Sequence, residues 1–387
     1  MARLANWKSL IVLAMAVAAS GHRPRHASAM EHVTMERAGR TRELVGRIVV
    51  EGQDGSLLFQ TLDGRMWVVE AEEVKQRRQD ELPFKPLSKE EVGRRLLQEL
   101  PRGFQIETTE HYVIAYNTSK AYARWCGNLW ERLYRGFFNY WQTRRLELHA
   151  PEFPLVALIF DDRAGFDEYA KEELGTAVGA VIGYYNFRSN RVVTFDLTGI
   201  AQQNAARRHR FQPAQIRQLL AQPAAERNVA TLIHEVTHQL AYNTGLQTRY
   251  AGNPFWVAEG LANFFETPDL RSSRGWRAIG KVNYFRLAEF RRHWSRPQEG
   301  RLIELIRDDR LFRNSKTAAA AYADAWALNY YLLKKKSKDY VAYLTELSKM
   351  KPLEVHTPEQ RLAEFQRFFG DIGRLQQDLL KTMRRLR

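Results

Sequence analysis

The sequence predicts an α+β fold in which β-structure fills the first half of the chain and helices fill the second. Residues 43–71 form short runs that alternate apolar and polar side chains, as half-buried strands do. Residues 104–197 combine several strand-like runs with one long helical pattern. From Pro223 to the end of the chain, apolar residues recur almost throughout at helical spacing. Together these patterns predict a mixed sheet followed by a largely helical part.

The first predicted unit is a small all-β module over residues 40–80. Its three alternating runs are separated by Asp54-Gly55 and by Asp63-Gly64, pairs that favour tight turns, so we expect a three-stranded meander. A meander of this size buries little apolar surface by itself. We therefore expect it to pack on the main domain or to belong to a barrel-like module completed by neighbouring segments, with a scaffold role. Residues 81–103 are expected to be a linker and a short helix.

The main domain is predicted over residues 104–345, and a helical extension over residues 346–387. A long helix is expected to follow the first strand, because apolar side chains recur at helical spacing between Tyr122 and Phe137. The predicted strands share apolar or alternating patterns and lie at residues 104–116, 154–160, 178–185 and 191–197. A mixed sheet is therefore expected to precede the helical part.

Composition narrows the class of protein but does not identify its function. The chain has 387 residues, 44% hydrophobic and 27% charged, which excludes a disordered chain and a membrane-embedded helix bundle. Its formal net charge of +15 favours acidic partners. There is no zinc-knuckle spacing, helix-turn-helix pattern or aromatic RNA-binding motif, so specific nucleic-acid binding is not expected. With Cys126 as its single cysteine, the chain forms no intramolecular disulfide.

Residues 1–29 are expected to be a signal peptide. Arg3 and Lys8 provide a basic start, and the apolar run that follows is too short to cross a bilayer comfortably. Cleavage fits after Ser20 or after Ala29, and the second is favoured because it also removes a segment rich in His and Arg. An uncleaved anchor is the alternative. We therefore expect export to the periplasm, the cell envelope or the extracellular space, with no transmembrane span after signal removal.

A His-Glu-x-x-His pattern at residues 234–238 points to metal chemistry. Pro223 and Gly245 bracket a helical segment around it. Residues four apart lie one turn apart on a helix, so His234 and His238 can face one ion about 2.0–2.1 Å away. Glu235 then flanks the ion without binding it, the position of a general base in metal-assisted hydrolysis.

A second helical pattern at residues 256–266 supplies the third candidate ligand. Its sequence, Trp-Val-Ala-Glu-Gly-Leu-Ala-Asn-Phe-Phe-Glu, places Glu259 shortly after the first helix ends. Two histidines and one glutamate, with a fourth position open for water, are the ligand set of thermolysin-like catalytic zinc sites. Structural zinc sites usually have four protein ligands and prefer cysteine. We therefore expect one catalytic Zn²⁺ per chain.

The two motifs together resemble those of the gluzincin class of zinc metallopeptidases, in peptidase clan MA. In that class, as in the zinc aminopeptidases, a His-Glu-x-x-His helix is followed by a Trp-x-x-Glu-Gly-x-Ala helix; here residues 234–266 carry the resemblance. The spacing from His238 to Glu259 is slightly longer than in the aminopeptidases, and their Gly-Ala-Met-Glu-Asn strand has no counterpart, so the resemblance indicates the class rather than that activity. It implies a thermolysin-like zincin domain.

A longer stretch, roughly residues 100–340, resembles an exported bacterial family catalogued as domain of unknown function 1570. The segments that carry this resemblance share short aromatic or polar strings and lie at residues 109–112, 122–127, 183–185 and 190–193. This family implies a fold but no substrate.

Five further residues are candidates for the site. The resemblance to the aminopeptidases implies that Tyr322 donates to the developing oxyanion, unless it is a core aromatic on an alanine-rich helix. Asn263 and Glu266 lie one and two turns beyond Glu259 and are candidates to orient the histidines, with capping or surface roles as the alternative. Tyr184 and Tyr185 lie on a strand that either forms the substrate-binding sheet edge or is an interior strand, in which case both pack in the sheet.

Three functions fit the sequence. The first is an exported zinc metallopeptidase that acts on a peptide or protein, with a cell-wall peptide among the candidate substrates. The second is a catalytically idle zincin that binds cell-wall polymer or another exported protein. The third is a basic protein that binds nucleic acid or another anionic polymer without zinc. The intact ligands and the retained Glu235 favour the first over the second. The substrate, endo- or exopeptidase action and the oligomeric state are not encoded in these patterns.

Overall fold

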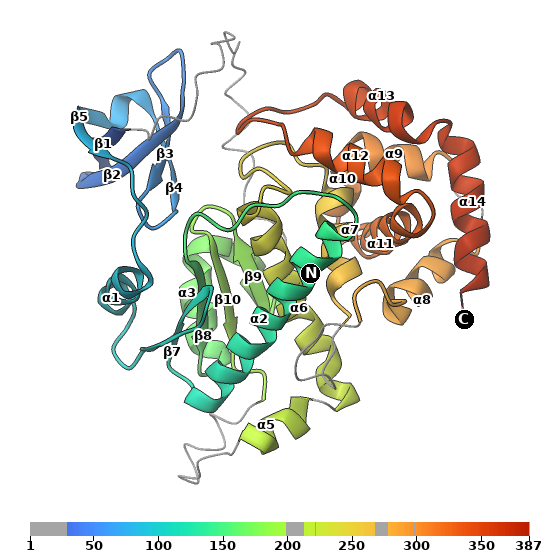
Figure 1. The fold of residues 1–387 in the computed structure, drawn as a ribbon, viewed down its shortest axis with the longest axis horizontal. Coiled ribbons are helices and arrows are strands. Elements are labelled where there is room, and N and C mark those ends of the chain that lie inside the picture. The colour runs from blue at the N-terminus through green and yellow to red at the C-terminus, as the bar shows by residue number, and fades with distance from the viewer. Residues whose placement is uncertain (1–28, 199–212, 221, 268–277, 297–298, 387) are drawn as a thin grey trace.

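The computed structural model describes residues 29–198, 213–220, 222–267, 278–296 and 299–386. The predicted signal peptide thus lies outside the described residues, except for Ala29. The predicted α+β class is confirmed, because two five-stranded sheets are followed by a helical C-terminal half (Figure 1). In these ranges no helix is both long enough and apolar enough to cross a membrane.

The N-terminal sheet has five strands rather than the expected three. Its order is β4-β3-β2-β1-β5, so two edges stay open and the sheet does not close into a barrel. Its strands are all antiparallel and are β1 (Ala29–Arg37), β2 (Arg40–Glu51), β3 (Leu57–Thr61), β4 (Met66–Val69) and β5 (Val74–Pro83). The predicted turns are present, with Gly55 and Gly64 at positive φ. Strand β5 had no detectable pattern because it is an edge strand whose side chains are almost all exposed.

The N-terminal sheet packs on the main domain through the turn between β3 and β4. The buried guanidinium of Arg249 donates two hydrogen bonds to the Gly64 carbonyl, at 2.9 Å each, and one to the Phe187 carbonyl at 3.1 Å. The Met66 N–H donates to the Arg188 carbonyl at 2.8 Å. Buried polar contacts therefore join the module to the main domain. This is the first of the two arrangements expected from the sequence, packing on the main domain rather than completion of a barrel.

The main sheet is mixed and has the order β6-β7-β8-β10-β9. Its strands are β6 (Gln105–Thr108), β7 (Tyr112–Tyr116), β8 (Leu155–Phe160), β9 (Gly183–Asn186) and β10 (Arg191–Phe195). The three central strands are parallel, whereas the edge strands β6 and β9 are antiparallel to their neighbours. The run at 104–116, expected to be one strand, is a hairpin of two. The run at 178–185 begins inside the 3₁₀ turn η3 (Gly175–Ala180) and becomes a paired strand only at Gly183.

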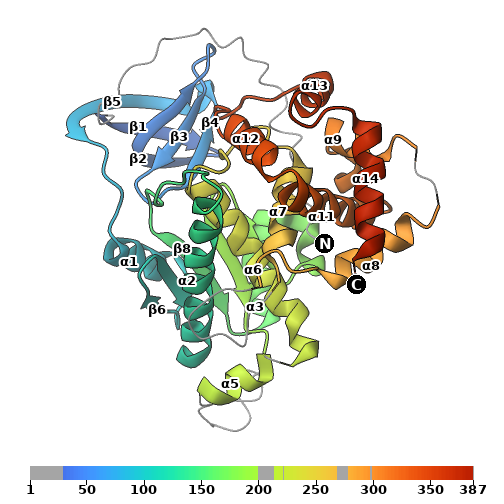
Figure 2. The same cartoon turned by 45° about the vertical axis from the view of Figure 1, so that its right-hand side comes forward.

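Helices cover both faces of the main sheet (Figure 2). Helices α1 (Lys89–Glu99) and α3 (Arg163–Leu174) pack on one face, where Val113, Leu158 and Val193 are buried. The other face is covered by α2 (Lys120–Gln142) and α6 (Pro223–Asn243), with α5 (Pro213–Leu220) beside them. Because both faces are buried, β8 is a continuous apolar run rather than an alternating one.

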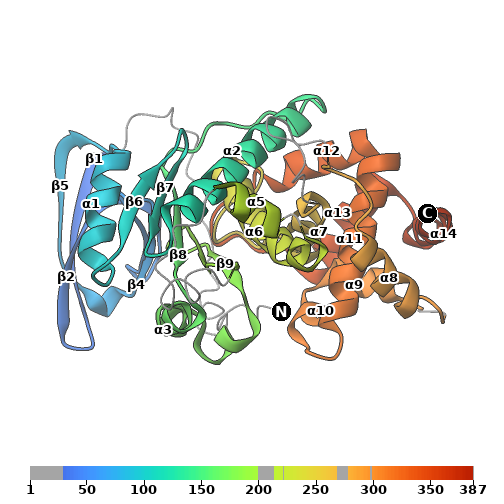
Figure 3. The same cartoon turned by 90° about the horizontal axis from the view of Figure 1, so that it is seen from below.

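The remaining helices pack around α11 and extend away from the sheet (Figure 3). They are α7 (Phe255–Phe265), α8 (Tyr284–His293), α9 (Arg301–Arg307), α10 (Arg310–Arg313), α11 (Ala318–Lys335), α12 (Ser337–Leu347), α13 (Pro358–Phe369) and α14 (Ile372–Arg385). Helices α7 and α11 approach closely at Gly260, where a Cβ atom would lie 1.9 Å from Asn329 Nδ2 and 2.5 Å from the Ala325 carbonyl oxygen. Only glycine allows this approach. Because Gly260 follows Glu259 in the chain, the approach brings α11 next to the segment that carries Glu259.

Candidate metal centre

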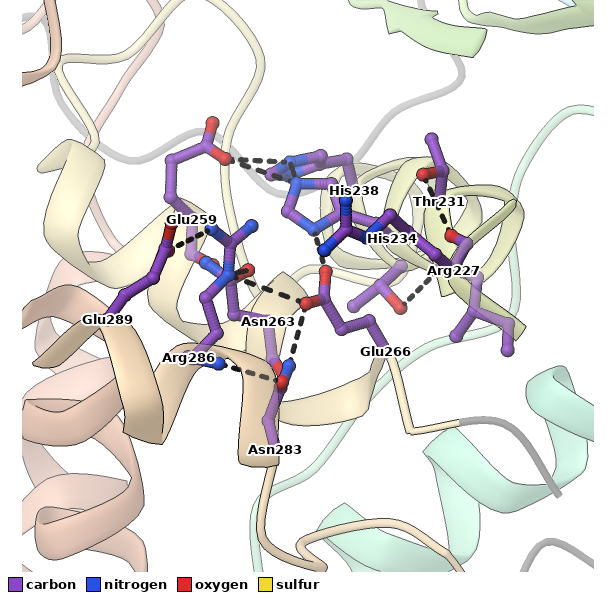
Figure 4. A network of polar contacts seen from close by, with 12 residues as sticks. Arg227, Thr231, His234, His238, Glu259, Asn263, Glu266, Asn283, Arg286 and Glu289 are labelled. Atoms are coloured by element: carbon purple, nitrogen blue, oxygen red, sulfur yellow. Dashed lines mark hydrogen bonds and ion pairs between the residues drawn. The ribbon is translucent and has the colours of Figure 1, made fainter. Parts of the chain in front are cut away.

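Helix α6 holds two of the predicted ligands one turn apart. It begins with Pro223 in its first turn, and the buried aliphatic side chains of Ile233, just before the motif, and Val236, within it, pack it into the core. The rings of His234 and His238 have centroids 4.8 Å apart. Their side chains project from one side of α6 toward α7 (Figure 4).

Helix α7 brings the third predicted ligand to the same point. The Nε2 atom of His234 lies 3.2 Å from Glu259 Oε2 and 3.2 Å from His238 Nε2, and the third side of the triangle, from His238 Nε2 to Glu259 Oε2, measures 3.6 Å. The three side chains are 11%, 12% and 11% exposed, in the order His234, His238 and Glu259. The two motifs are therefore assembled into one nearly buried cluster.

The triangle has the dimensions of a zinc site. Tetrahedral ligands at bond lengths of about 2.0–2.1 Å are separated by about 3.3 Å, close to the three measured separations. A circle through these three atoms has a radius of about 1.9 Å, so the three atoms would be able to hold one ion at bond lengths of about 2 Å. Two imidazole nitrogens and one carboxylate oxygen thus fit Zn²⁺ and leave its fourth position to a water molecule.

Glu266 fixes the orientation of His234. Its Oε2 atom lies 2.9 Å from His234 Nδ1, and its Oε1 atom accepts a hydrogen bond from Asn283 Nδ2 at 2.7 Å. A proton held on Nδ1 by this carboxylate leaves the Nε2 lone pair directed at the centre of the triangle. The structure thus places Glu266 where the sequence analysis expected a residue that orients a histidine.

The hydrogen bonds of Asn263 go to groups other than the two histidines. Its Nδ2 atom donates to the backbone carbonyl of Glu259 at 2.7 Å, and its Oδ1 atom accepts from Arg286 Nε at 2.9 Å. Asn263 is completely buried, so it supports the segment that carries the third ligand.

Two residues of this network had no signal in the sequence. Asn283 caps the N-terminus of α8, and Arg286 lies in its first turn, with Arg286 Nε 3.6 Å from Glu266 Oε1. Figure 4 shows α8 beside α7, with Arg286 directed toward Asn263 and Glu266. No spacing rule connects them with the motif of α6, because they reach the site only through the packing of α8.

The charges of the cluster favour a bound cation. Burial lowers the pKa of His234, but hydrogen bonds to Glu259 and Glu266 outweigh burial and raise this pKa to about 10. Burial opposes ionisation of Glu259, but His238 and His234 outweigh it and hold the pKa of this carboxyl well below its ordinary value. In the absence of a metal, a proton on His234 offsets the charge of Glu259, so a metal ion has to displace that proton.

Glu235 lies beside the free edge of the main sheet. Its Oε2 atom accepts a hydrogen bond from the backbone N–H of Tyr185 at 2.8 Å. Strand β9 is the edge strand, and in an antiparallel pair the N–H and C=O of one residue point to the same side, so both polar groups of Tyr185 face away from β10. Burial raises the pKa of Glu235, with His234 and His238 acting in the opposite direction.

The side chains of the two candidate substrate-binding tyrosines are engaged in packing. The Tyr184 hydroxyl donates to Glu173, on one side of the sheet. On the other side, the Tyr185 ring stacks on Tyr242, with centroids 5.8 Å apart, and its hydroxyl donates to Asn190 at 2.8 Å. Beside Glu235, strand β9 therefore presents its main chain and not the side chains of these tyrosines.

Tyr322 lies on α11 close to the carboxylates of the cluster. Its ring packs edge-to-face on Phe312 at 5.5 Å, and the Arg286 guanidinium lies 5.5 Å from its centroid. Burial raises the pKa of Tyr322 well above its ordinary value, and Glu259 and Glu235 raise it further. Its hydroxyl is therefore neutral and able to donate throughout the neutral range.

A second group with metal-ligand atoms has a structural explanation. It comprises Glu110, His111 and Glu131. Both oxygens of Glu131 already accept hydrogen bonds, from the Thr109 hydroxyl, the His111 N–H and His111 Nδ1, at 2.6–2.8 Å. Glu131 thus fastens the turn between β6 and β7 to α2.

Comparison with known proteins gives one family match. A family described as "Protein of unknown function (DUF1570)" matches residues 228–354, about a third of the chain. The match includes the motif residues of α6 and the whole of α7 and α11, and it supports the resemblance to this family. Residues 100–227, which also suggested the resemblance, lie outside it. No curated protein matches the chain.

Proposed function

We propose that the chain is a zinc-dependent metallopeptidase of the gluzincin type, with a thermolysin-like zincin domain. The observation that carries the proposal is the triangle of His234 Nε2, His238 Nε2 and Glu259 Oε2, whose sides of 3.2, 3.2 and 3.6 Å suit a tetrahedral ion with one open position. The basic, then apolar, N-terminal sequence further supports export, which would place the substrate in the cell envelope or outside the cell.

In this proposal each residue of the centre has one chemical role. A bound Zn²⁺ supplies Lewis acidity toward the scissile carbonyl and acidifies the attacking water. Glu235 takes the proton of that water and delivers it to the leaving amine. The Tyr322 hydroxyl donates to the developing oxyanion. The main-chain groups of β9 that face away from β10, apart from the Tyr185 N–H that already donates to Glu235, pair with an extended peptide, which orients the scissile bond over Glu235.

Metal content and cleavage test the proposal together. We expect one Zn²⁺ per purified chain, cleavage of members of a broad peptide library, loss of cleavage after chelation and recovery on addition of Zn²⁺. Elemental analysis and mass spectrometry of the digested library measure these outcomes. Bound zinc without any cleavage would favour the alternative, an idle zincin whose net charge of +15 serves to bind cell-wall polymer or another exported protein. A chain without zinc would contradict both the ligands and the mechanism.

Glu266→Gln is expected to weaken zinc binding by roughly 10- to 100-fold, because the amide cannot hold the proton on His234 Nδ1 as a carboxylate does. A competition titration against a zinc chelator of known affinity measures the change. Glu289→Gln is the matched control. It removes the same charge, and it does so at a glutamate that contacts Arg286 Nη1 at 3.3 Å. Equal zinc affinities for the two variants would contradict the role of Glu266.

A further inference from the structure

We infer that Arg227, Phe285 and Arg286 form a subsite that recognises a carboxylate of the peptide substrate within a few residues of the scissile bond. This inference rests on the proposed function and adds a substrate class to it. The subsite lies where the N-terminal part of α6 meets the start of α8.

Arg227 lies on the same face of α6 as the two histidines. It precedes His234 by seven residues, which is close to two helical turns and corresponds to about 10 Å along the helix axis. Figure 4 shows the side chains of Arg227, His234 and His238 projecting from the same side of the helix, toward α7 and α8. An extended peptide covers about 3.3 Å per residue. Arg227 is therefore within reach of a substrate side chain about two to four residues from the scissile bond.

The exposed ring of Phe285 lies beside both guanidinium groups. It is 45% exposed, which is unusual for a large apolar side chain in this structure. The Arg227 guanidinium lies 4.3 Å from the centroid of its ring, and the Arg286 guanidinium lies 5.3 Å from it. Arg286 is already held by Asn263 and Glu289, so the cation–π contact with the shared ring serves mainly to hold the long side chain of Arg227 in place. The ring also offers an apolar surface to the methylene groups of an acidic side chain.

The two guanidinium groups differ in how their charge is balanced. Arg286 lies 3.3 Å from Glu289 and 3.6 Å from Glu266. Arg227, in contrast, has no carboxylate within ion-pair distance among the residues that the structure describes. The backbone carbonyl of Arg227 accepts from Thr231, which fixes its turn of the helix but leaves the guanidinium available. An oriented guanidinium without an acidic partner is suited to bind a carboxylate through two parallel hydrogen bonds.

The test compares peptides that differ by one acidic group. The probes are fluorescent peptides of one parent sequence that the protein binds, with Glu or Gln at each position in turn, and each with a free or an amidated C-terminus. Binding is measured with the Glu235→Gln protein, which does not turn the peptides over, and kcat/KM is measured with the active protein. We expect Glu at one position to improve both by about tenfold over Gln, as hydrogen bonds between charged groups do. A preference that follows the free C-terminus would assign the same chemistry to the terminal carboxylate.

Arg227→Gln is expected to abolish this preference, so that the Glu/Gln ratio falls to about one, whereas Arg227→Lys retains part of it. Phe285→Leu is expected to reduce the ratio several-fold, because the guanidinium loses its ring. Arg384→Gln, an exposed arginine on α14, is the control with the same charge change and should keep the full ratio. Unchanged zinc content and melting temperature show that each variant is folded.

The outcomes separate this inference from the proposed function. A Glu/Gln ratio near one in the unmodified subsite, or a ratio that survives Arg227→Gln, overturns the inference even if peptides are cleaved. If no peptide is cleaved but Glu-dependent binding is lost with Arg227→Gln, the subsite stands and the peptidase proposal fails.

Discussion

Glu235→Gln is expected to lower kcat by roughly 100- to 10,000-fold, the range over which a well-placed general base contributes. The amide has nearly the shape of the carboxylate, but it cannot accept a proton from the attacking water. Glu235 belongs to none of the three sides of the ligand triangle, so the zinc stoichiometry of the variant should equal that of the wild-type protein. Elemental analysis together with pre-steady-state and steady-state cleavage assays measures both quantities.

Two controls make the result specific. Glu226→Gln makes the same chemical change in the first turn of α6, at an exposed position, and should leave both activity and metal content unchanged. Glu259→Ala should instead lose the metal and the activity together, because only two protein ligands remain. Full cleavage by Glu235→Gln would exclude this residue as the base, and loss of zinc from Glu235→Gln would show that the variant disturbs the ligands.

Tyr322→Phe is expected to lower kcat by roughly 100- to 1,000-fold, the typical effect of removing one oxyanion donor. KM should change little, because the hydroxyl acts on charge that develops only in the transition state. Burial, followed by the charges of Glu259 and Glu235, holds the pKa of Tyr322 well above its ordinary value, so this hydroxyl should cause no loss of activity up to pH 10. Steady-state kinetics over a pH series measures both expectations.

Tyr330→Phe is the matched control for Tyr322→Phe. Tyr330 lies two turns further along α11 and contacts Phe264 and Trp326 rather than the carboxylates. Both variants should bind one zinc ion, and only Tyr322→Phe should be slow. If both variants have wild-type kcat, Tyr322 is a packing residue, as its contact with Phe312 would also allow.

The cluster of His234, His238 and Glu259 could be predicted from the sequence because helical periodicity determines most of its geometry. In a buried helix with aliphatic neighbours such as Ile233 and Val236, residues 234 and 238 share one face whatever the rest of the fold is. The glutamate of the second helix was expected from its spacing, and Gly260 then permits the close packing of α11 that brings Tyr322 nearby. Local patterns were therefore sufficient for residues that lie on or next to the motif helices.

Features that depend on tertiary packing could not be predicted. Strand β5 is polar on both sides because it lies at a sheet edge, so its sequence contains no alternation. Asn283 and Arg286 join the site only because α8 packs against α7 and α11, a long-range contact without a short-range signature. For the same reason, the sequence did not distinguish an edge position of β9 from an interior one.

Helix α8 connects the exposed Phe285 with the buried cluster around His234. Its first turn binds Glu266, which holds His234, and the same turn presents Phe285 to solvent. Thermodynamic linkage makes such a connection reciprocal: if a peptide seated on Phe285 keeps α8 in place and tightens metal binding by some factor, the metal tightens peptide binding by that same factor. Under the proposed function, occupancy of the two sites would then rise together when either ligand is scarce, and loss of the metal would weaken substrate binding by the same factor.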